Sequence, residues 1–348
     1  MDARQALEEI ATLLERELAN PFKARAFRKA AAAIEPFDDA ELAARIADGR
    51  LKRTPGVGDT TYAVIVEASE GRTPAYLADL RKQAGLTPDG AGAERTGLFA
   101  AARGDLHSHT DWSDGTTSIA TMARAAADLG LEYLVVSDHS PRLTVANGLT
   151  AERLAAQLEI VEALDALHDS ADGALGIRLL PGIEVDINAD GTLDQTPEML
   201  DRLAVVVASV HSKLRAPKDE MTERMLRAVA NPYTNVLAHC TGRLVAGNRG
   251  TRPPSEFDAE RVFAACAERD VAVEINSRPE RQDPPDELIA LALAAGCRFS
   301  IDSDAHAPGH FAFLGLGAER AARAGIPAER IVTTWELPRL LEWSHAKR

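Results

Sequence analysis

The sequence predicts two folded parts: a small all-helical helix-hairpin-helix domain, then a larger α/β domain forming a distorted TIM-like barrel of seven β/α units. Helical periodicity without strands runs through about the first 85 residues. From Gly104 onward, short β-rich apolar runs alternate with segments rich in Ala and Leu, the pattern of a parallel barrel. We therefore expect domains at residues 1–85 and 103–348, joined by a Gly- and Ala-rich linker over 86–102.

The N-terminal part is expected to form helices at residues 4–19, 22–34, 39–48 and 59–69, with helical structure ending near Gln83. Lys52, Arg53, Gly56 and Gly58 stand before the last of these four helices. In a Gly-x-Gly turn between helices, backbone N–H groups can approach a phosphate, and the following helix presents its N-terminus to the same anion. We expect these four residues to bind the DNA backbone without sequence preference; an ordinary turn is the alternative.

In the second part, the segment Asp105–His109 is expected to end the first strand, and further apolar runs predict the others. These runs are Tyr133–Val136, Ile177–Leu180, Ala204–Val210, Asn235–Ala238, Val271–Ile275, Cys297–Ile301 and Ile331–Thr333. Helices are expected between them, at Ile119–Leu129, Ala151–Leu167, Asp258–Glu268 and Pro285–Ala295.

Composition excludes several classes of protein. The 348 residues are 45% hydrophobic and 26% charged, which is typical of a globular chain. No apolar run approaches the ~20 residues of a membrane span, and the N-terminus lacks the apolar segment of a secretory signal. Three cysteines are too few for a disulfide framework, so we expect a cytoplasmic protein without membrane contacts. The net charge of −14, of which residues 1–85 contribute −1, argues against nucleic-acid binding by overall charge.

Imidazole and carboxylate side chains gather where the predicted strands end. Six of the nine histidines lie there, with three carboxylates among them: His107, His109, Asp114, His139, Glu184, His211, His239, Asp304 and His306. Because the carboxyl ends of parallel barrel strands open onto one face, these side chains should converge. Neutral imidazole with carboxylate suits Zn²⁺, Mn²⁺ or Fe²⁺, so the sequence predicts a multinuclear metal site. The remaining histidines, His168, His310 and His345, are interpreted as surface or packing residues.

The motifs Asp105-Leu106-His107-Ser108-His109, Gly182-Ile183-Glu184 and Ser303-Asp304-Ala305-His306 resemble the polymerase and histidinol phosphatase (PHP) superfamily. The resemblance extends over about residues 103–335. Thr241–Leu244 and Glu274–Ser277 are similar to the PHP domain of bacterial X-family DNA polymerases (PolX). The N-terminal part resembles the small helix-hairpin-helix domain of the same polymerases. Their palm domain has no counterpart here, so no polymerase activity is expected.

The resemblance implies three divalent ions, zinc or manganese, with iron also possible. The implied ligands are His107, His109 and Asp304 for one ion, Glu184 bridging to a second on His211 and His239, and Asp114, His139 and His306 for the third. It also implies substrate-side roles for three residues, with Arg243 and Arg281 pairing with phosphate and Asn276 contacting substrate or water. Lys213 and Arg249 are further candidates for phosphate. Asp105, Asp138 and Asp302 are expected to orient ligand histidines.

We expect a metal-dependent phosphoesterase, a DNA 3′–5′ exonuclease or 3′-end-processing enzyme with DNA as its partner. The alternative is a phosphatase for a small phosphomonoester such as histidinol phosphate or a nucleotide, which the acidic charge favours. A non-catalytic DNA-binding protein with a structural metal cluster is a third possibility, although structural zinc sites are usually closed sets of Cys and His. Cys240 stands where the family usually has Pro, as an extra soft ligand or a small buried residue.

Overall fold

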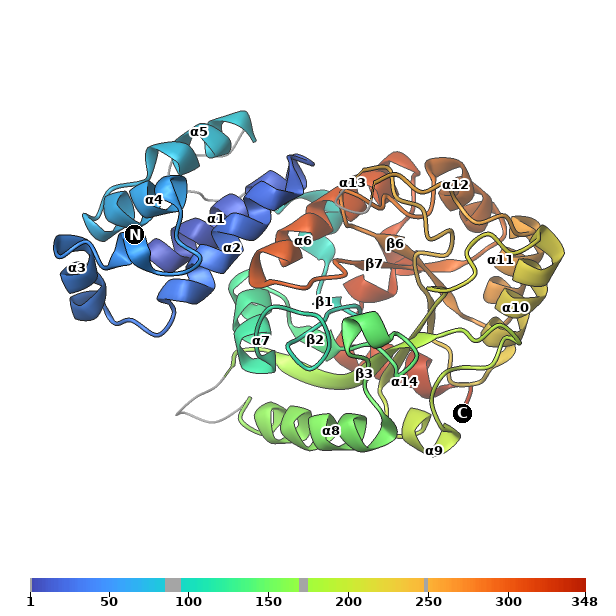
Figure 1. The fold of residues 1–348 in the computed structure, drawn as a ribbon. Helices are drawn as coiled ribbons and strands as arrows, with labels where there is room; N and C mark the ends of the chain where they lie inside the picture. The colour runs from blue at the N-terminus through green and yellow to red at the C-terminus, as the bar shows by residue number, and fades with distance from the viewer. Residues whose placement is uncertain (1, 85–94, 169–174, 247–249) are drawn as a thin grey trace. The chain divides into compact units, whose positions relative to one another are not determined.

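The structure is a computed structural model that describes residues 2–84, 95–168, 175–246 and 250–348 (Figure 1). These residues fall into two compact units, one within Met1–Arg95 and the other formed by Thr96–Val245 and Thr251–Arg348. Of the linker expected over 86–102, residues 86–94 lie outside the described residues. Its last part is a short helix, α6 (Gly97–Ala101), which packs against α13 (Leu314–Arg323) of the barrel unit.

The first unit is entirely helical in its described residues. Its elements are α1 (Ala3–Arg16), α2 (Pro21–Ile34), α3 (Asp39–Ala47), η1 (Leu51–Arg53), α4 (Asp59–Ser69) and α5 (Ala75–Gln83). The apolar face of α1, including Leu7 and Ile10, packs with Phe27 and Ile65 in one core. Helix α1 ends earlier than predicted because Leu18 takes a left-handed backbone conformation, with φ of 51°.

The second unit is a nearly closed barrel of seven parallel strands in sequence order. The strands are β1 (Gly104–Asp105), β2 (Tyr133–Val136), β3 (Arg178–Asp186), β4 (Val205–Ser209), β5 (Val236–Leu237), β6 (Ala272–Asn276) and β7 (Arg298–Asp302). Chain segments just after β1 and β7 meet where the His109 backbone N–H donates to the Ala305 carbonyl, over 2.8 Å. This closure lies at the carboxyl ends of the strands.

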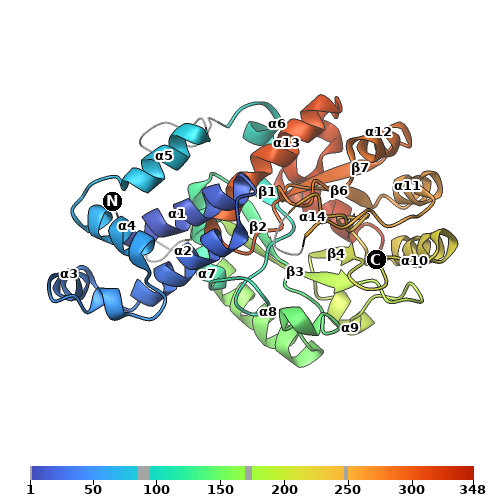
Figure 2. The same cartoon turned by 45° about the horizontal axis from the view of Figure 1, so that its top comes forward.

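Helices surround the strands (Figure 2). Besides α6 and α13 they are α7 (Ile119–Asp128), α8 (Ala151–Asp165), α9 (Pro197–Leu200), α10 (Lys218–Ala230), α11 (Ala259–Glu268), α12 (Asp286–Ala294) and α14 (Leu337–His345). Helix α14 covers the amino end of the barrel, where Leu340 and Trp343 join the apolar residues that fill its interior, among them Tyr133 and Val207. The opposite, carboxyl end is therefore the one left open for a site.

Short 3₁₀ helices complete the barrel unit: η2 (Thr144–Ala146), η3 (Pro308–Phe313), η4 (Ala328–Arg330) and η5 (Val332–Thr334). The prediction of a strand at Ile331–Thr333 was wrong, because this segment forms η5 and only Ile331 bridges to Phe299 of β7. The apolar character that suggested a strand serves instead to bury Ile331 and Val332.

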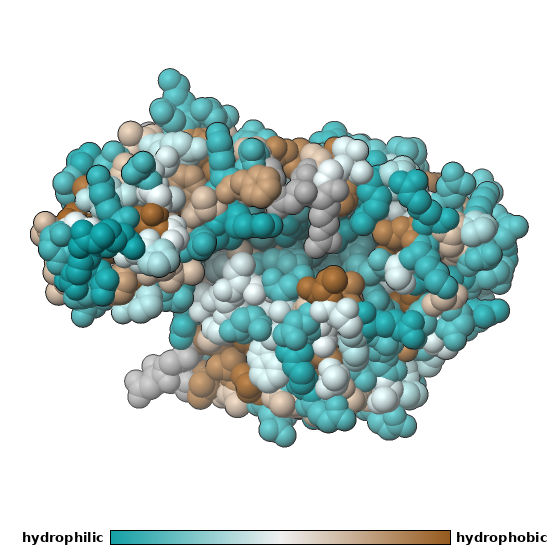
Figure 3. Space-filling view, viewed as in Figure 1, coloured by the Kyte–Doolittle hydropathy of each residue, from teal (hydrophilic) through white to brown (hydrophobic). Residues whose placement is uncertain are grey.

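No helix in the described ranges has both the length and the apolar character needed to span a bilayer. On the face of the barrel unit drawn in Figure 3, hydrophobic side chains are scattered among hydrophilic ones.

Candidate metal centre

The nine side chains predicted at the strand ends gather at the carboxyl end of the barrel. They are His107, His109 and Asp114 after β1, His139 after β2, Glu184 on β3, His211 after β4, His239 after β5, and Asp304 and His306 after β7. Six are buried, whereas the side chains of Asp114, His211 and His306 remain 28%, 13% and 23% exposed. The site is therefore deep on the side of β1 and β5 and open to solvent at these three residues.

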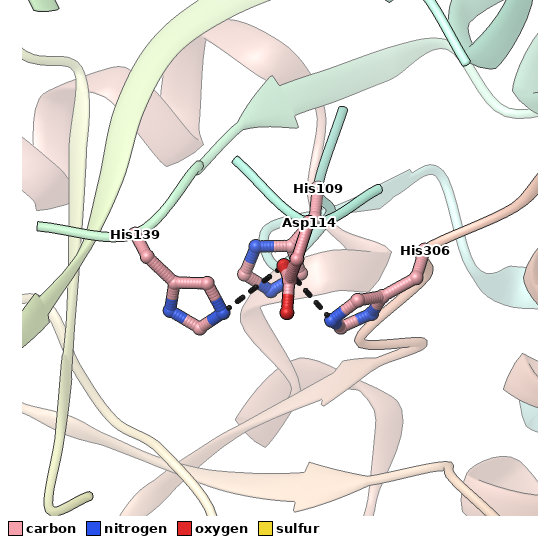
Figure 4. A group of neighbouring side chains, drawn as sticks. All are labelled: His109, Asp114, His139 and His306. Carbon is pink, nitrogen blue, oxygen red and sulfur yellow. Dashed lines mark ion pairs between the residues drawn. The ribbon is translucent and has the colours of Figure 1, made fainter. Parts of the chain in front are cut away.

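The potential ligand atoms form four overlapping groups, each with its atoms within 4.8 Å of one another. The groups are His107, His239 and Asp304; His107, His109 and Glu184; His139, Glu184 and His211; and His109, Asp114, His139 and His306. Figure 4 shows the last group, in which the Nε2 atoms of His139 and His306 each lie 3.4 Å from Asp114 Oδ1. The family resemblance implies that His109 binds the first ion alone. In the structure its ring belongs to two groups, one with His107 and Glu184 and one with Asp114, His139 and His306.

The Glu184 carboxylate is the centre of the cluster and contacts imidazoles from four strand ends. Its Oε1 lies 2.8 Å from His239 Nε2 and 3.2 Å from His211 Nε2. Its Oε2 lies 2.7 Å from His139 Nδ1 and 3.3 Å from His107 Nε2. A single carboxylate placed between so many imidazoles has the position required of a bridging ligand.

Burial and neighbouring charges together shift the pKa values of the cluster, and for Glu184 and His139 the neighbouring charges outweigh burial. Burial would raise the pKa of Glu184, but the imidazoles of His139 and His107 hold it well below its usual range. Burial would lower the pKa of His139, but Glu184 and Asp114 raise it to about 10. Burial, with His139 and His306 close by, lowers the pKa of His109 to about 3. The cluster as it stands thus requires compensating positive charge beside Glu184.

The donor set fits divalent ions. Among the described residues, neither ring nitrogen of His109 has a hydrogen-bond partner, and Asp114 Oδ1 and His107 Nε2 also lack one. Buried polar atoms without partners are costly, and imidazole and carboxylate lone pairs are what Zn²⁺ and Mn²⁺ bind. Ions within these groups would satisfy the atoms that the protein leaves unpaired.

Comparison with known proteins decides the family. A model of the PHP domain matches residues 105–278, half of the chain, and a model of the helix-hairpin-helix domain matches residues 2–73. The chain belongs to the PHP family. The DNA polymerase/3′-5′ exonuclease PolX of Bacillus subtilis (strain 168) is 38% identical over 204 residues, which cover 59% of this chain and 34% of that protein. This chain therefore corresponds to about a third of that relative's length.

Other relatives are named as phosphatases. A probable phosphatase of Thermoanaerobacter sp. (strain X514) is 29% identical over 213 residues, covering 58% of this chain and 78% of that protein. The histidinol phosphate phosphatase of Lactococcus lactis, solved with zinc, L-histidinol and phosphate, aligns over 65% of this chain and 95% of that one, with 17% identity and a TM-score of 0.47.

Two carboxylates missed in the sequence orient ligands of the PHP cluster. Glu274 Oε1 accepts a hydrogen bond from His107 Nδ1 over 2.6 Å, and Glu274 Oε2 accepts one from the His239 backbone N–H over 2.6 Å. Asp186 Oδ1 lies 2.5 Å from His211 Nδ1. Such carboxylates fix which ring nitrogen faces a metal. For Asp186 the sequence held a signal: in the triplet Glu184-Val185-Asp186 of β3, the two carboxylates alternate along a strand and therefore point to the same face as each other.

The three aspartates expected to orient ligand histidines accept hydrogen bonds from backbone N–H groups and form none with the histidine rings. Asp105 accepts from the backbone N–H of His107 at 3.0 Å, and Asp302 accepts from that of Leu106 at 2.9 Å. Asp138 accepts from the Thr110 backbone at 2.8 Å and from its hydroxyl at 2.6 Å, which holds the loop before Asp114. These carboxylates therefore position the ligands through the main chain.

The three residues expected to contact substrate make hydrogen bonds or ion pairs within the protein. The Asn276 side chain is buried, donates to Asp304 Oδ2 over 3.1 Å and accepts from the Arg278 backbone N–H over 3.1 Å. The Asn276 amide therefore holds Asp304, and its contact with substrate or water stays a prediction. Arg281 Nε lies 3.0 Å from Asp304 Oδ2, and Arg243 Nε donates to the Arg281 carbonyl over 3.2 Å.

The other predicted candidates are Cys240, Lys213 and Arg249. Cys240 is buried in the apolar core, burial raises the pKa of its thiol well above the usual range, and it lies in none of the four groups. Lys213 stands in the loop after β4 with a left-handed φ of 53°. Arg249 lies outside the described residues.

In the helix-hairpin-helix unit, the two glycines serve different purposes. Gly56 has φ of 101°, and a Cβ there would come within 3.2 Å of the Lys29 carbonyl oxygen, so glycine is required. The Gly58 N–H donates to Thr61 Oγ1 over 2.9 Å and is already satisfied, whereas the Gly56 N–H has no acceptor among the described residues. Lys52 and Arg53 are exposed, and Lys52 Nζ lies 4.9 Å from the Tyr62 ring centre. Of the predicted anion contacts, Gly56, Lys52 and Arg53 stay available.

Proposed function

We propose that this PHP protein is a metal-dependent phosphoesterase that shortens DNA from its 3′ end. The observation that carries the proposal is the Glu184-centred set of nine ligands in the open end of the barrel, in one chain with a helix-hairpin-helix unit. Divalent ions in such a set lower the pKa of bound water and neutralise phosphate oxygens, the two requirements of phosphoester hydrolysis.

The residues of the site divide their work. Three ions, zinc or manganese, would be held by His107, His239 and Asp304, by His139, His211 and Glu184, and by His109, Asp114, His139 and His306, in overlapping groups. Burial would raise the pKa of Asp304, but the Arg281 guanidinium keeps it well below its usual range, so this ligand stays ionised. Glu274 and Asp186 hold the rings of His107 and His211.

The first unit would supply contacts to the DNA backbone. Lys52 and Arg53 supply positive charge beside the Gly56 turn, where the backbone N–H can meet a phosphate oxygen. At the barrel, Arg243 and Arg281 stay the candidates for the substrate phosphate, because a cluster rich in carboxylates needs cations to admit an anion.

The second candidate is a phosphatase for a small phosphomonoester. The charge distribution favours it, since all but −1 of the net charge of −14 lies outside residues 1–85 and repels a long polyanion. The PHP relatives named as probable phosphatases are consistent with this candidate.

The deciding experiment is hydrolysis of a 5′-labelled single-stranded oligonucleotide with Mn²⁺ or Zn²⁺, with EDTA as a control. Stepwise shortening that EDTA stops supports the exonuclease. An intact oligonucleotide, with p-nitrophenyl phosphate cleaved by the same preparation, supports the phosphatase. Glu184→Ala should abolish either activity and His107→Ala nearly so, while Glu198→Gln, at an exposed position of α9, serves as the control. Full turnover of Glu184→Ala would contradict the ligand set.

A further inference from the structure

The turn that follows β7 carries two of the predicted ligands, Asp304 and His306. Asp304 has a left-handed φ of 50°, a region that residues other than glycine seldom adopt. Asp304 belongs to the ligand group of His107 and His239, whereas His306 belongs to the group of Asp114. The path of three residues, from Asp304 to His306, therefore sets the relative position of two metal sites.

Two side chains outside the ligand set contact both ends of this turn. Arg278 Nη1 donates to the Asp304 carbonyl oxygen over 3.3 Å. His310 Nδ1 accepts from the His306 backbone N–H over 3.1 Å, and Arg278 Nη1 lies 3.1 Å from the same ring nitrogen. The His306 ring also returns to the turn, because its Nδ1 lies 2.9 Å from the Asp304 carbonyl oxygen and can donate to it. This last contact leaves His306 Nε2 to face Asp114.

Both side chains are themselves held in place. Glu280 Oε1 accepts from Arg278 Nε over 2.8 Å and from Arg278 Nη2 over 2.5 Å, so that the guanidinium is fixed at the end remote from the turn. The His310 ring is 3% exposed as a residue and stacks on Phe313, with ring centres 5.1 Å apart. We call Arg278, Glu280 and His310 the turn clamp.

We propose that the turn clamp positions Asp304 and His306 for metal binding, so that it sets the affinity of two ion sites without contacting an ion. The inference rests on the proposed metal centre. The competing explanation is that the buried His310 only fills space. In that case an apolar side chain of similar size would serve as well. The clamp instead requires an acceptor where His310 Nδ1 lies.

The test compares four variants of the full-length chain by zinc titration, after confirming that the wild type binds zinc. His310→Leu removes the acceptor and should lower zinc affinity 10–100-fold, the range expected when an outer partner of a ligand is lost. His310→Asn offers an oxygen near the Nδ1 position and should recover much of the affinity. Phe313→Leu removes the stacked ring but leaves His310 Nδ1 in place, so it should bind zinc as the wild type does.

A second readout needs no metal. In the metal-free chain, the His306 amide should exchange its hydrogen faster in His310→Leu than in the wild type, while Phe313→Leu should leave it protected. Unchanged zinc affinity together with unchanged exchange in His310→Leu would overturn the clamp. If His310→Leu fails to fold, Arg278→Met decides, because it should lose zinc affinity to a similar extent and wild-type affinity would contradict the proposal. A wild-type chain that binds no zinc would contradict the metal centre itself.

Discussion

Glu274 shows how a single residue can organise a metal site from behind it. Its side chain is fully buried, and its two oxygens accept from an imidazole and from a backbone N–H that belong to two different ligands, His107 and His239. His239 needs such support because its backbone is left-handed, with φ of 24°. The carboxylate thus fixes a ring at one ligand and a main-chain path at the other.

Glu274→Gln tests this role at nearly constant volume. One end of the glutamine amide must present N–H to a group that is itself a donor, so one of the two hydrogen bonds is lost. We expect zinc affinity to fall roughly 10–100-fold, as for other outer partners of metal-binding histidines. Isothermal titration with zinc measures the change, and Glu198→Gln on α9 is the matched control. Equal affinities in Glu274→Gln and the wild type would show that the carboxylate does not orient the ligands.

At the scale of an element, α13 lies so close to the sheet that one of its residues has no room for a side chain. A Cβ on Gly317 would come within 2.3 Å of Ser277 Oγ and 2.8 Å of Ile301 Cγ2. Two residues earlier, a Cβ on Gly315 would meet only the Phe99 ring at 3.6 Å, an ordinary contact. The same helix therefore contains a glycine that packing requires and one that it does not.

Alanine substitutions at these positions should have opposite effects on the free energy of unfolding. Gly317→Ala should lower it by about 2 kcal/mol, because α13 must move away from β6 and β7. Gly315→Ala should leave it unchanged or raise it by up to ~1 kcal/mol, the gain in helix propensity. Urea unfolding measures both. Similar values for the two variants would contradict the close approach.

The segment that ends α14 brings an amine close to the amino end of the barrel. Lys347 Nζ donates to the Thr234 carbonyl oxygen just before β5, and burial lowers the pKa of this amine to about 8. The unfolded chain keeps the ordinary lysine pKa of about 10.4. Below pH 8 both states are protonated, and the folded state carries the full cost of burying the charge.

Stability should therefore rise with pH between about 8 and 10 through Lys347, because there the unfolded state binds more protons than the folded state. Lys347→Met should remove this rise, so that the difference in unfolding free energy between wild type and variant changes by roughly 2–3 kcal/mol from pH 7 to 10. Urea unfolding of both proteins over this range provides the measurement. Parallel pH profiles would show that the amine titrates normally.

Across the whole molecule, the cations of the first unit differ in whether they are free to meet a polyanion. Arg28 is paired with Glu8 and Glu15 at 2.5 Å each, and the buried Arg81 is paired with Glu9 at 2.6 Å. These pairs hold α1 against α2 and α5. Lys52 and Arg53, beside the glycine turn, are exposed and make no ion pair among the described residues. We therefore expect Lys52 and Arg53, rather than Arg28 or Arg81, to contribute to DNA binding by this unit.

The double variant Lys52→Ala, Arg53→Ala should weaken oligonucleotide hydrolysis at low substrate concentration and leave hydrolysis of p-nitrophenyl phosphate unchanged. Each lost phosphate contact should also reduce the slope of log KM against log salt by about 1. Lys82→Ala, exposed on α5, is the matched control. Equal losses on both substrates would point to a damaged barrel, and no loss on either would exclude the turn from substrate binding.

Helix positions were predictable because they depend on local periodicity and capping. The structure places α4 at Asp59–Ser69 as expected and ends α5 at Gln83, both set by residues close in sequence. The expected strand at Ile331–Thr333 failed for the complementary reason: an apolar run becomes a strand only if a neighbour pairs with it, and here one bridge forms. His310 was interpreted as a packing residue because the acceptor role of its ring depends on Arg278 and His306, which no local pattern connects.

The sequence by itself determined the seven-strand barrel, the helical unit before it and the nine ligand candidates. The periodicity of helices and strands can be recognised along the chain, and the carboxyl ends of parallel strands always open onto one face. Only the tertiary structure decided which candidates lie close enough to share an ion, that Glu184 lies among five of the histidines, and that Glu274 and Asp186 contact two of these histidines from behind. Those relations depend on distances across the barrel. The distances follow from closure between the ends of β1 and β7, about 200 residues apart in sequence.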